Sequence, residues 1–90
     1  MMVKLSIIIV NYNVTQLLRN CLLSIEKYLE NISYEVIVID NKSPDSSWGD
    51  LIPEFPKVHF IASETNDGFS KANNKAIQSA RGEYLLILNP

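Results

Sequence analysis

Polar residues that could bind a ligand follow each of four apolar runs in this sequence. They are, in chain order, Asn11–Asn13, Asp40–Ser43, Asn66–Lys71 and Asn89. A carboxylate such as Asp40 can accept hydrogen bonds from a base imide or a ribose, and directly after a strand we expect it to be exposed yet rigidly held. Asp40 fits equally well as a loop carboxylate that caps neighbouring backbone amides, and spacing alone leaves both interpretations open.

The other candidates also have ordinary structural explanations. Asn66-Asp67-Gly68 consists of turn residues. Asn73 and Asn74 are harder to explain, because Asn is a weak helix former and both lie within an expected helix. Lys71 could meet a phosphate, although single surface cations are usually just solvated. Tyr12 is either a rim aromatic or a ring on which a base could stack.

Two common classes of nucleotide-binding protein are disfavoured. The loop Val10-Asn11-Tyr12-Asn13 contains no glycine, whereas a dinucleotide-binding fold needs glycine there for the backbone to approach pyrophosphate. NAD and FAD are therefore poor candidates. The sequence also lacks a Gly-x-x-x-x-Gly-Lys-Ser/Thr loop, which excludes a P-loop ATPase or GTPase. A nucleotide held mainly by side chains remains.

The residues that must position these groups form alternating strand and helix patterns. Strands are predicted at Leu5–Val10, Tyr34–Ile39, Val58–Ala62 and Tyr84–Leu88. The first helical pattern runs to about Asn31, with Asn13 or Thr15 as its cap, and Trp48–Pro56 can hold only a short helix. A last helix has Phe69, Ala72, Asn73, Ala76 and Ala80 on one face and ends at a left-handed Gly82.

Apolar strands separated by helices predict an α/β fold, namely a Rossmann-like, three-layer parallel sheet with strand order 3-2-1-4. In such sheets a ligand binds outside the carboxyl ends of the strands, where the strand order reverses. We therefore expect the side chains of Asn11, Asp40 and Asn66 to meet in one crevice at that edge.

Composition limits the partners and the compartment. The chain has 90 residues, 47% of them hydrophobic and 20% charged, as expected for one soluble globular domain. The net charge of -2 and the scattered Lys and Arg argue against nucleic acid as a partner. The single cysteine, Cys21, excludes an internal disulfide. Without a signal sequence or an apolar run of about 18 residues, we expect a cytoplasmic protein.

Four segments together resemble the family-two glycosyltransferases of the GT-A fold. They are Ser6–Asn13, Glu35–Ser43, Asn66–Asn74 and Ala80–Leu85. Each segment is weak alone, but four in the right order and at the right intervals are specific. The pattern is closest to bacterial rhamnosyltransferase-type members that build surface polysaccharides. The resemblance implies that residues 1–90 are the N-terminal, nucleotide-sugar-binding part of a glycosyltransferase domain.

The resemblance also implies roles for individual residues. Val10, Asn11 and Tyr12 would line the base pocket, Asp40 would bind the base, and Asn66, Gly68, Lys71 and Asn73 would lie near base, ribose and phosphates. Asn89 occupies the first position of an Asp-x-Asp motif that holds a divalent metal, Mg or Mn, and Pro90 follows it. The chain would then be truncated before the main metal ligand, and Asn89 would orient ribose or water instead.

For the parent enzyme the resemblance implies an inverting hexosyltransferase that uses a nucleotide-diphosphate sugar. Its acceptor would be a saccharide or lipid-linked hydroxyl, met in the cytoplasm or at the inner face of the membrane. No residue present resembles the required general base, so we predict no catalytic residues here and nucleotide binding without turnover. A non-catalytic binding or assembly module is the alternative, and a nucleotidyltransferase is disfavoured because it normally carries a Gly-rich basic loop after the first strand.

The strand at Leu85–Leu88 has a further implication. If nothing flanks it, its apolar side chains form an exposed edge, and such edges pair with other chains. We therefore also expect a homo-oligomer formed through this strand.

Overall fold

The computed structural model describes residues 2–66 and 68–90. Within these residues one parallel sheet contains four strands, which are β1 (Leu5–Asn11), β2 (Tyr34–Asp40), β3 (His59–Ala62) and β4 (Tyr84–Leu88). Their order is β3-β2-β1-β4, which confirms the predicted topology.

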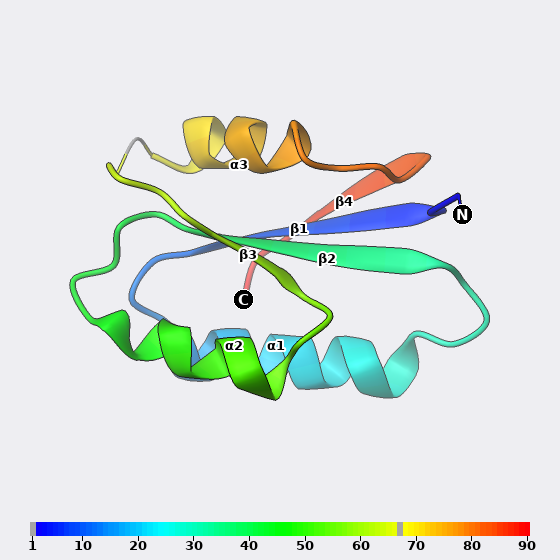
Figure 1. Cartoon of the computed structure of the whole chain (residues 1–90), viewed down its shortest axis with the longest axis horizontal. Helices are drawn as coiled ribbons and strands as arrows, with labels where there is room; N and C mark the ends of the chain where they lie inside the picture. The colour runs from blue at the N-terminus through cyan, green and yellow to red at the C-terminus, as the bar shows by residue number, and fades with distance from the viewer. Residues whose placement is uncertain (1, 67) are drawn as a thin grey trace.

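Helices cover both faces of this sheet. They are α1 (Thr15–Tyr28), the 3-10 helix η1 (Ser46–Asp50), α2 (Leu51–Glu54) and α3 (Phe69–Ile77). Figure 1 shows α3 on one side of the strands and α1 with α2 on the other, so the chain forms three layers. Among the described residues, none of these helices combines the length and apolar character needed to cross a bilayer.

Strand alternation divides the core into two halves. Ile7 and Ile9 of β1 pack with Leu18 and Leu22 of α1, and all four are at most 1% exposed. The intervening Ile8 faces the opposite way, into the cluster that contains α3. The central strands are apolar at nearly every position because both faces are covered.

The face under α3 is built from small residues. Ala72 and Ala76 pack against Ile8, Ile37 and Ile39, and both alanines are at most 1% exposed. The small side chains leave little bulk between the helix and the strands. The predicted apolar face of this helix is therefore confirmed for these two alanines.

The start and end of α1 differ from the prediction. The helix ends at Tyr28 rather than near Asn31, because Leu29 is extended and Asn31 has a φ of 61°. Val14 occupies the N-cap position and makes no side-chain cap. The Thr15 hydroxyl is hydrogen-bonded to Ser47 instead, at 2.9 Å, so its tertiary contact replaces the expected cap.

Gly82 is not the left-handed helix terminus that the sequence suggested. The helix α3 ends at Ile77, and the positive φ among the described glycines belongs to Gly68. Gly82 is needed for a different reason, since a Cβ there would lie 2.5 Å from both the backbone nitrogen and the Oγ of Ser6. The chain passes so close to β1 that it leaves no room for a side chain.

A polar cluster fixes this close approach. The Ser6 hydroxyl donates to Glu35 Oε2 at 2.6 Å and accepts from the Gly82 N–H at 2.8 Å. The Arg81 N–H donates to the same Glu35 oxygen at 2.6 Å. Burial of the Glu35 carboxylate raises its pKa, but the hydrogen bonds from Ser6 and Arg81 and the Arg81 charge outweigh that effect, so the pKa lies below its ordinary value. The charged carboxylate thus joins β2, β1 and the segment that enters β4.

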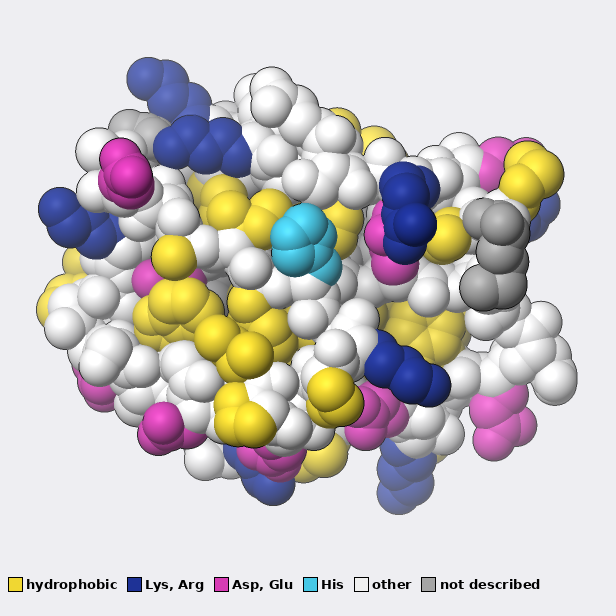
Figure 2. All heavy atoms as spheres, in the orientation of Figure 1, with side chains coloured by type: hydrophobic (Ala, Val, Ile, Leu, Met, Phe, Trp, Pro, Cys, Tyr) yellow, Lys and Arg dark blue, Asp and Glu magenta, His cyan; other side chains and the backbone are white. Residues whose placement is uncertain are grey.

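The two edge strands differ in their surroundings. β3 presents His59, which Figure 2 shows at the surface with hydrophobic side chains beside it. On the other edge, Tyr84, Leu85, Leu86 and Ile87 of β4 are 43–57% exposed. The predicted apolar edge at this strand is therefore present in the chain.

The packing of Gly82 can be tested by comparing two glycine substitutions. We expect Gly82→Ala to lower the free energy of unfolding by about 1–3 kcal/mol, because backbone atoms must move to admit the methyl group. Gly49→Ala is the matched control, since a Cβ at Gly49 would have nothing within 4 Å of it and the φ of this glycine is not positive. Urea denaturation of both variants measures the difference, and equal stabilities would contradict the close approach.

Candidate functional site

Three loops meet at the carboxyl edge of the sheet. Figure 1 shows the segments that follow β1, β2 and β3 on the same side of the molecule, at the left of the view. Among the described residues, each loop contains one with a positive φ, which is Asn13 (φ 56°), Lys42 (φ 60°) or Gly68 (φ 85°). Non-glycine residues adopt this conformation at a cost, and such residues are common at functional sites.

A buried side-chain pair lies where β1 and β2 end. Asn11 and Asp40 are register partners, and the Asn11 Nδ2 donates to Asp40 Oδ1 at 2.9 Å. Asn11 is 0% exposed and Asp40 is 3% exposed. The expectation that Asp40 is an exposed carboxylate is therefore wrong, because the following loop folds over it.

Ser43 forms the cover over this carboxylate. Its N–H donates to Asp40 Oδ2 at 2.9 Å, and its hydroxyl donates to Asp40 Oδ1 at 2.5 Å. The same hydroxyl accepts the Asn13 N–H at 2.8 Å, which joins the loops after β1 and β2. Asp40 thus receives three hydrogen bonds and caps a neighbouring backbone amide, so of the two interpretations the structure displays the loop-capping one. Binding of a base by Asp40 stays a prediction.

One atom of the pair is left without a hydrogen bond. The Asn11 Oδ1 is buried and has no partner among the described residues, and the same holds for Asn73 Oδ1 in α3. An unsatisfied buried acceptor costs roughly 1–3 kcal/mol. Such unsatisfied groups are rare in folded proteins, and each calls for an explanation other than stability, such as a functional role.

The third loop is tied to the second by amide side chains. The Asn41 Nδ2 donates to Asn66 Oδ1 at 2.8 Å, and the Gly68 N–H donates to the same oxygen at 3.2 Å. The Asn41 N–H in turn donates to the Asn11 carbonyl at 2.9 Å. The three loops therefore meet at one edge of the sheet, but the side chain that reaches Asn66 is that of Asn41, and the expected meeting of Asn11, Asp40 and Asn66 in one crevice is not observed.

A hollow of about 310 Å³ opens between these loops. It is lined by Val10, Tyr12, Val14, Asn41, Asn66, Gly68, Phe69 and Asn89. Five of these were predicted from the sequence as nucleotide-binding residues, namely Val10, Tyr12, Asn66, Gly68 and Asn89. The described part of the chain thus brings a 46% exposed tyrosine ring, apolar walls and several amide groups to the switch point between β1 and β4.

Four predicted site residues do not line the hollow. Asn11 and Asp40 come one position after residues of the α3-facing cluster, so strand alternation turns their side chains toward the α1 face. They support the hollow from beneath. Lys71 is exposed on α3 outside the lining, and Asn73 is buried on the same helix, 4% exposed. Asp67 lies outside the described residues.

Sequence reasoning missed three residues of the lining. Val14 and Phe69 are apolar residues at the first turns of helices, where a polar ligand site gives no obvious signal. Asn41 belongs to the polar cluster after β2, but the nucleotide-binding role was predicted for Asp40 beside it. A signal was available, because alternate residues of a strand face opposite sides and only one of two neighbours can face the crevice.

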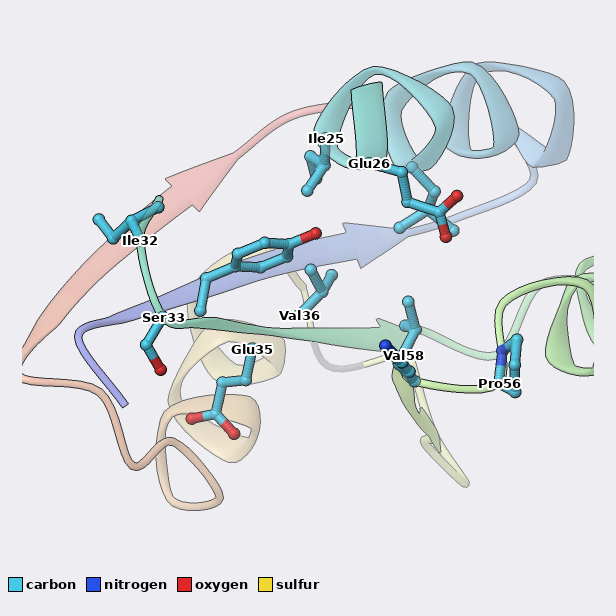
Figure 3. Close-up of a pocket in the computed structure, with 11 residues that line it drawn as sticks. Ile25, Glu26, Ile32, Ser33, Glu35, Val36, Pro56 and Val58 are labelled. Atoms are coloured by element: carbon cyan, nitrogen blue, oxygen red, sulfur yellow. The ribbon is translucent and has the colours of Figure 1, made fainter. Parts of the chain in front are cut away.

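A larger hollow, of about 510 Å³, lies at the amino end of the sheet. It is bordered by the C-terminal half of α1, the first residues of β2 and the segment before β3. Figure 3 shows Ile25 extending from α1 toward the strand that carries Val36, whereas Glu35 points to the other side of that strand. Its lining mixes aliphatic side chains with charged ones and it lies away from the switch point, so the smaller hollow is the better candidate for a nucleotide.

The described residues do not form a metal site. No group of three or more His, Cys, Asp or Glu side chains among them lies close enough together to hold a metal ion. At the crevice, Asn89 supplies only a neutral amide, and the Asp40 carboxylate is already occupied by three donors. The donor set present therefore does not fit a divalent cation.

Comparison with known protein families gives one clear match. The model described as glycosyl transferase family 2 matches residues 6–90. Among curated proteins, the chain is 37% identical to a poly(ribitol-phosphate) beta-glucosyltransferase of Bacillus spizizenii, over 96% of this chain and 14% of that protein. It is 29% identical to a dolichol-phosphate mannosyltransferase of Pyrococcus furiosus, over 96% of this chain and 25% of that protein. The chain thus spans a quarter or less of the length of either relative.

Solved structures show the same arrangement. Staphylococcus aureus TarS 1-349 in complex with UDP superimposes with a TM-score of 0.84 at 27% identity, over 96% of this chain and 27% of that chain. The mannosyltransferase PcManGT from Pyrobaculum calidifontis, in complex with GDP-Man and Mn2+, gives a TM-score of 0.82 at 20% identity, over 99% and 28%. The second likeness supports the fold alone.

Proposed function

The chain belongs to glycosyl transferase family 2, and from that premise we propose that residues 1–90 form the N-terminal, nucleotide-sugar-binding part of a glycosyltransferase domain of the GT-A fold. The observation that carries the proposal is the hollow at the carboxyl edge of the sheet, where β1 lies between β2 and β4. This is the position at which open α/β sheets bind their ligands.

The lining of the hollow suits a nucleobase and the groups attached to it. Tyr12 offers an exposed aromatic face for stacking, and Val10 and Phe69 add apolar surface around it. Asn66 and Asn89 carry amides, which can donate to and accept from a base or a ribose. Tyr12 and these neighbours are the binding residues we propose, with Asn11 and Asp40 supporting them and Lys71 and Asn73 nearer the phosphates.

The comparisons support the ligand class. TarS 1-349 is known in complex with UDP and with UDP-GlcNAc, at 27% and 30% identity to this chain. Two curated relatives are named as a glucosyltransferase and a mannosyltransferase. We therefore propose a nucleotide-diphosphate sugar as the ligand and hexosyl transfer as the reaction of the whole protein.

In the proposed reaction an acceptor hydroxyl oxygen forms a bond to the anomeric carbon as the bond to the nucleoside diphosphate breaks, with inversion. The acceptor proton goes to a general base, and the acceptor is a saccharide or a lipid-linked hydroxyl in surface polysaccharide synthesis. A relative named for teichuronic acid biosynthesis, 32% identical over 62% of this chain, supports polysaccharide synthesis. The cytoplasm or the inner membrane face is the location that we propose for this reaction. A divalent metal, Mg or Mn, belongs to the proposal for the whole protein only.

We propose that the 90-residue chain alone binds nucleotide without turnover. The described residues that line the hollow include no carboxylate that could take the acceptor proton. The alternative, a non-catalytic binding or assembly module, differs only in whether the whole protein transfers a sugar. An assay of sugar transfer from nucleotide-sugars to an acceptor by the whole protein would distinguish the glycosyltransferase from the non-catalytic module.

Nucleotide binding can be tested by NMR titration of isotope-labelled chain with UDP, dTDP and GDP. We expect shifts at Tyr12, Asn41 and Asn66 with at least one of them. Tyr12→Ala should lower the affinity for that nucleotide about fivefold or more, since base–aromatic stacking is worth about 1–3 kcal/mol. Tyr28→Ala, which removes a 72% exposed tyrosine at the end of α1, should leave the affinity unchanged. Absence of shifts at these residues with all three nucleotides would refute the proposal.

We also propose that the chain forms a homo-oligomer through β4. This strand lies at the edge of the sheet, so one side of its backbone has no neighbouring strand among the described residues, and its exposed side chains are apolar. A second copy could pair with it strand to strand about a two-fold axis.

Sedimentation velocity tests this proposal. We expect a dimer or larger species, and we expect Leu85→Lys to convert it to monomer by placing a charge on the edge strand. Leu17→Lys, which changes a 53% exposed leucine on α1, is the matched control and should leave the oligomer intact. A wild-type monomer at high concentration would contradict the proposal.

A further inference from the structure

Asn41 occupies a fixed place between the three loops. It follows directly after β2, is 4% exposed, and contributes to the lining of the hollow. Its N–H donates to the Asn11 carbonyl at 2.9 Å, which continues the β1–β2 hydrogen bonding by one residue. The backbone of Asn41 therefore has the rigidity of the sheet rather than that of a loop.

The side chain of Asn41 extends this rigidity to the next loop. Its Nδ2 donates to Asn66 Oδ1 at 2.8 Å, and the Gly68 N–H donates to the same oxygen at 3.2 Å. A backbone N–H can only donate, so the oxygen of Asn66 must face Gly68, and Asn41 must then be the donor. The direction of the Asn41–Asn66 hydrogen bond is fixed by this geometry.

The residues held in this way form one wall of the hollow. Asn66, Gly68 and Phe69 belong to it, whereas Val10 and Tyr12 belong to the end of β1 and the loop after it. Gly68 is also the N-cap residue of α3, with a φ of 85°. A change in the Asn66 position therefore moves one wall relative to the other and shifts the start of α3.

We propose that Asn41 is a positioning residue of the nucleotide site, whose amide N–H holds Asn66, and through it Gly68, at the distance that a bound base requires. The proposal rests on the nucleotide-binding function proposed above. It assigns Asn41 an action through Asn66, which in turn faces the ligand.

Two isosteric substitutions at opposite ends of one hydrogen bond test the proposal. Asn41→Asp removes the donor and sets a carboxylate against the Asn66 oxygen. Asn66→Asp keeps an acceptor for both Asn41 and Gly68 and adds the same charge at the other end of the hydrogen bond. Asn41→Leu removes the donor with little change in shape and adds no charge. It serves as the test if Asn41→Asp fails to fold because it sets a second carboxylate beside the buried Asp40.

The first measurement needs no ligand. Hydrogen exchange of the Gly68 amide should accelerate about tenfold in Asn41→Asp and Asn41→Leu and stay within about twofold in Asn66→Asp, because only the first two lose the donor. Exchange of Ile8 and Ile37, in the sheet core, should be unchanged in all three variants. Equal exchange of Gly68 in the Asn41 and Asn66 variants would overturn the proposal.

The second measurement is the affinity for the nucleotide that the wild type binds best among UDP, dTDP and GDP. Asn41→Asp and Asn41→Leu should each bind about tenfold more weakly than the wild type, whereas Tyr28→Ala, outside the lining of the hollow, should bind as the wild type does. Wild-type affinity in both Asn41 variants would overturn the positioning role. A wild type that binds none of the nucleotides would refute the proposed function and the positioning role with it, while the exchange of Gly68 would still decide whether Asn41 holds Asn66 and Gly68 in place.

Discussion

The buried hydrogen bond between Asn11 and Asp40 is the contact on which the carboxyl edge of this sheet depends. It joins the last paired residues of the two central strands, and both side chains are almost fully buried. Ser43 closes over the same carboxylate and fastens the loop after β1 through Asn13. A buried charge is tolerated only when its hydrogen bonds are satisfied, so the loop conformation and the charge require each other.

The α1 side and the α3 side of this edge differ in structure. Toward α1, Asn11 and Asp40 form a closed polar contact. Toward α3, Tyr12 and Asn66 border an open hollow whose walls are partly apolar. A family 2 glycosyltransferase that binds a nucleotide-sugar in this hollow would use the first set for rigidity and the second for recognition. Placing a recognition surface on a preorganised support lowers the entropy lost on binding.

The fold was predictable because its signals are local and strong. Largely apolar runs such as Leu5–Val10, separated by helical patterns, indicate a parallel sheet, and the order follows once the fourth strand returns beside the first. The environment of single residues was not predictable in the same way. Asp40 is buried because Ser43 folds back over it, and Gly82 is required because Ser6 lies against it; both facts depend on residues distant in sequence or on loop geometry. The assignment passed over Asn41 because the choice between two polar neighbours depends on which face each presents.

The Asp40 carboxylate holds the two loops together by accepting hydrogen bonds at both oxygens. The most direct measurement compares the free energies of unfolding of Asp40→Asn and Asp45→Asn. Asp45 accepts one hydrogen bond, from the Ser47 N–H, and in Asp45→Asn the amide oxygen can still accept it. Asp40→Asn turns an NH2 group toward a donor, and we predict a loss of about 1–3 kcal/mol. For Asp45→Asn we predict a change within about 0.5 kcal/mol, since Asn caps as well as Asp. Equal stabilities of the two variants would contradict the account.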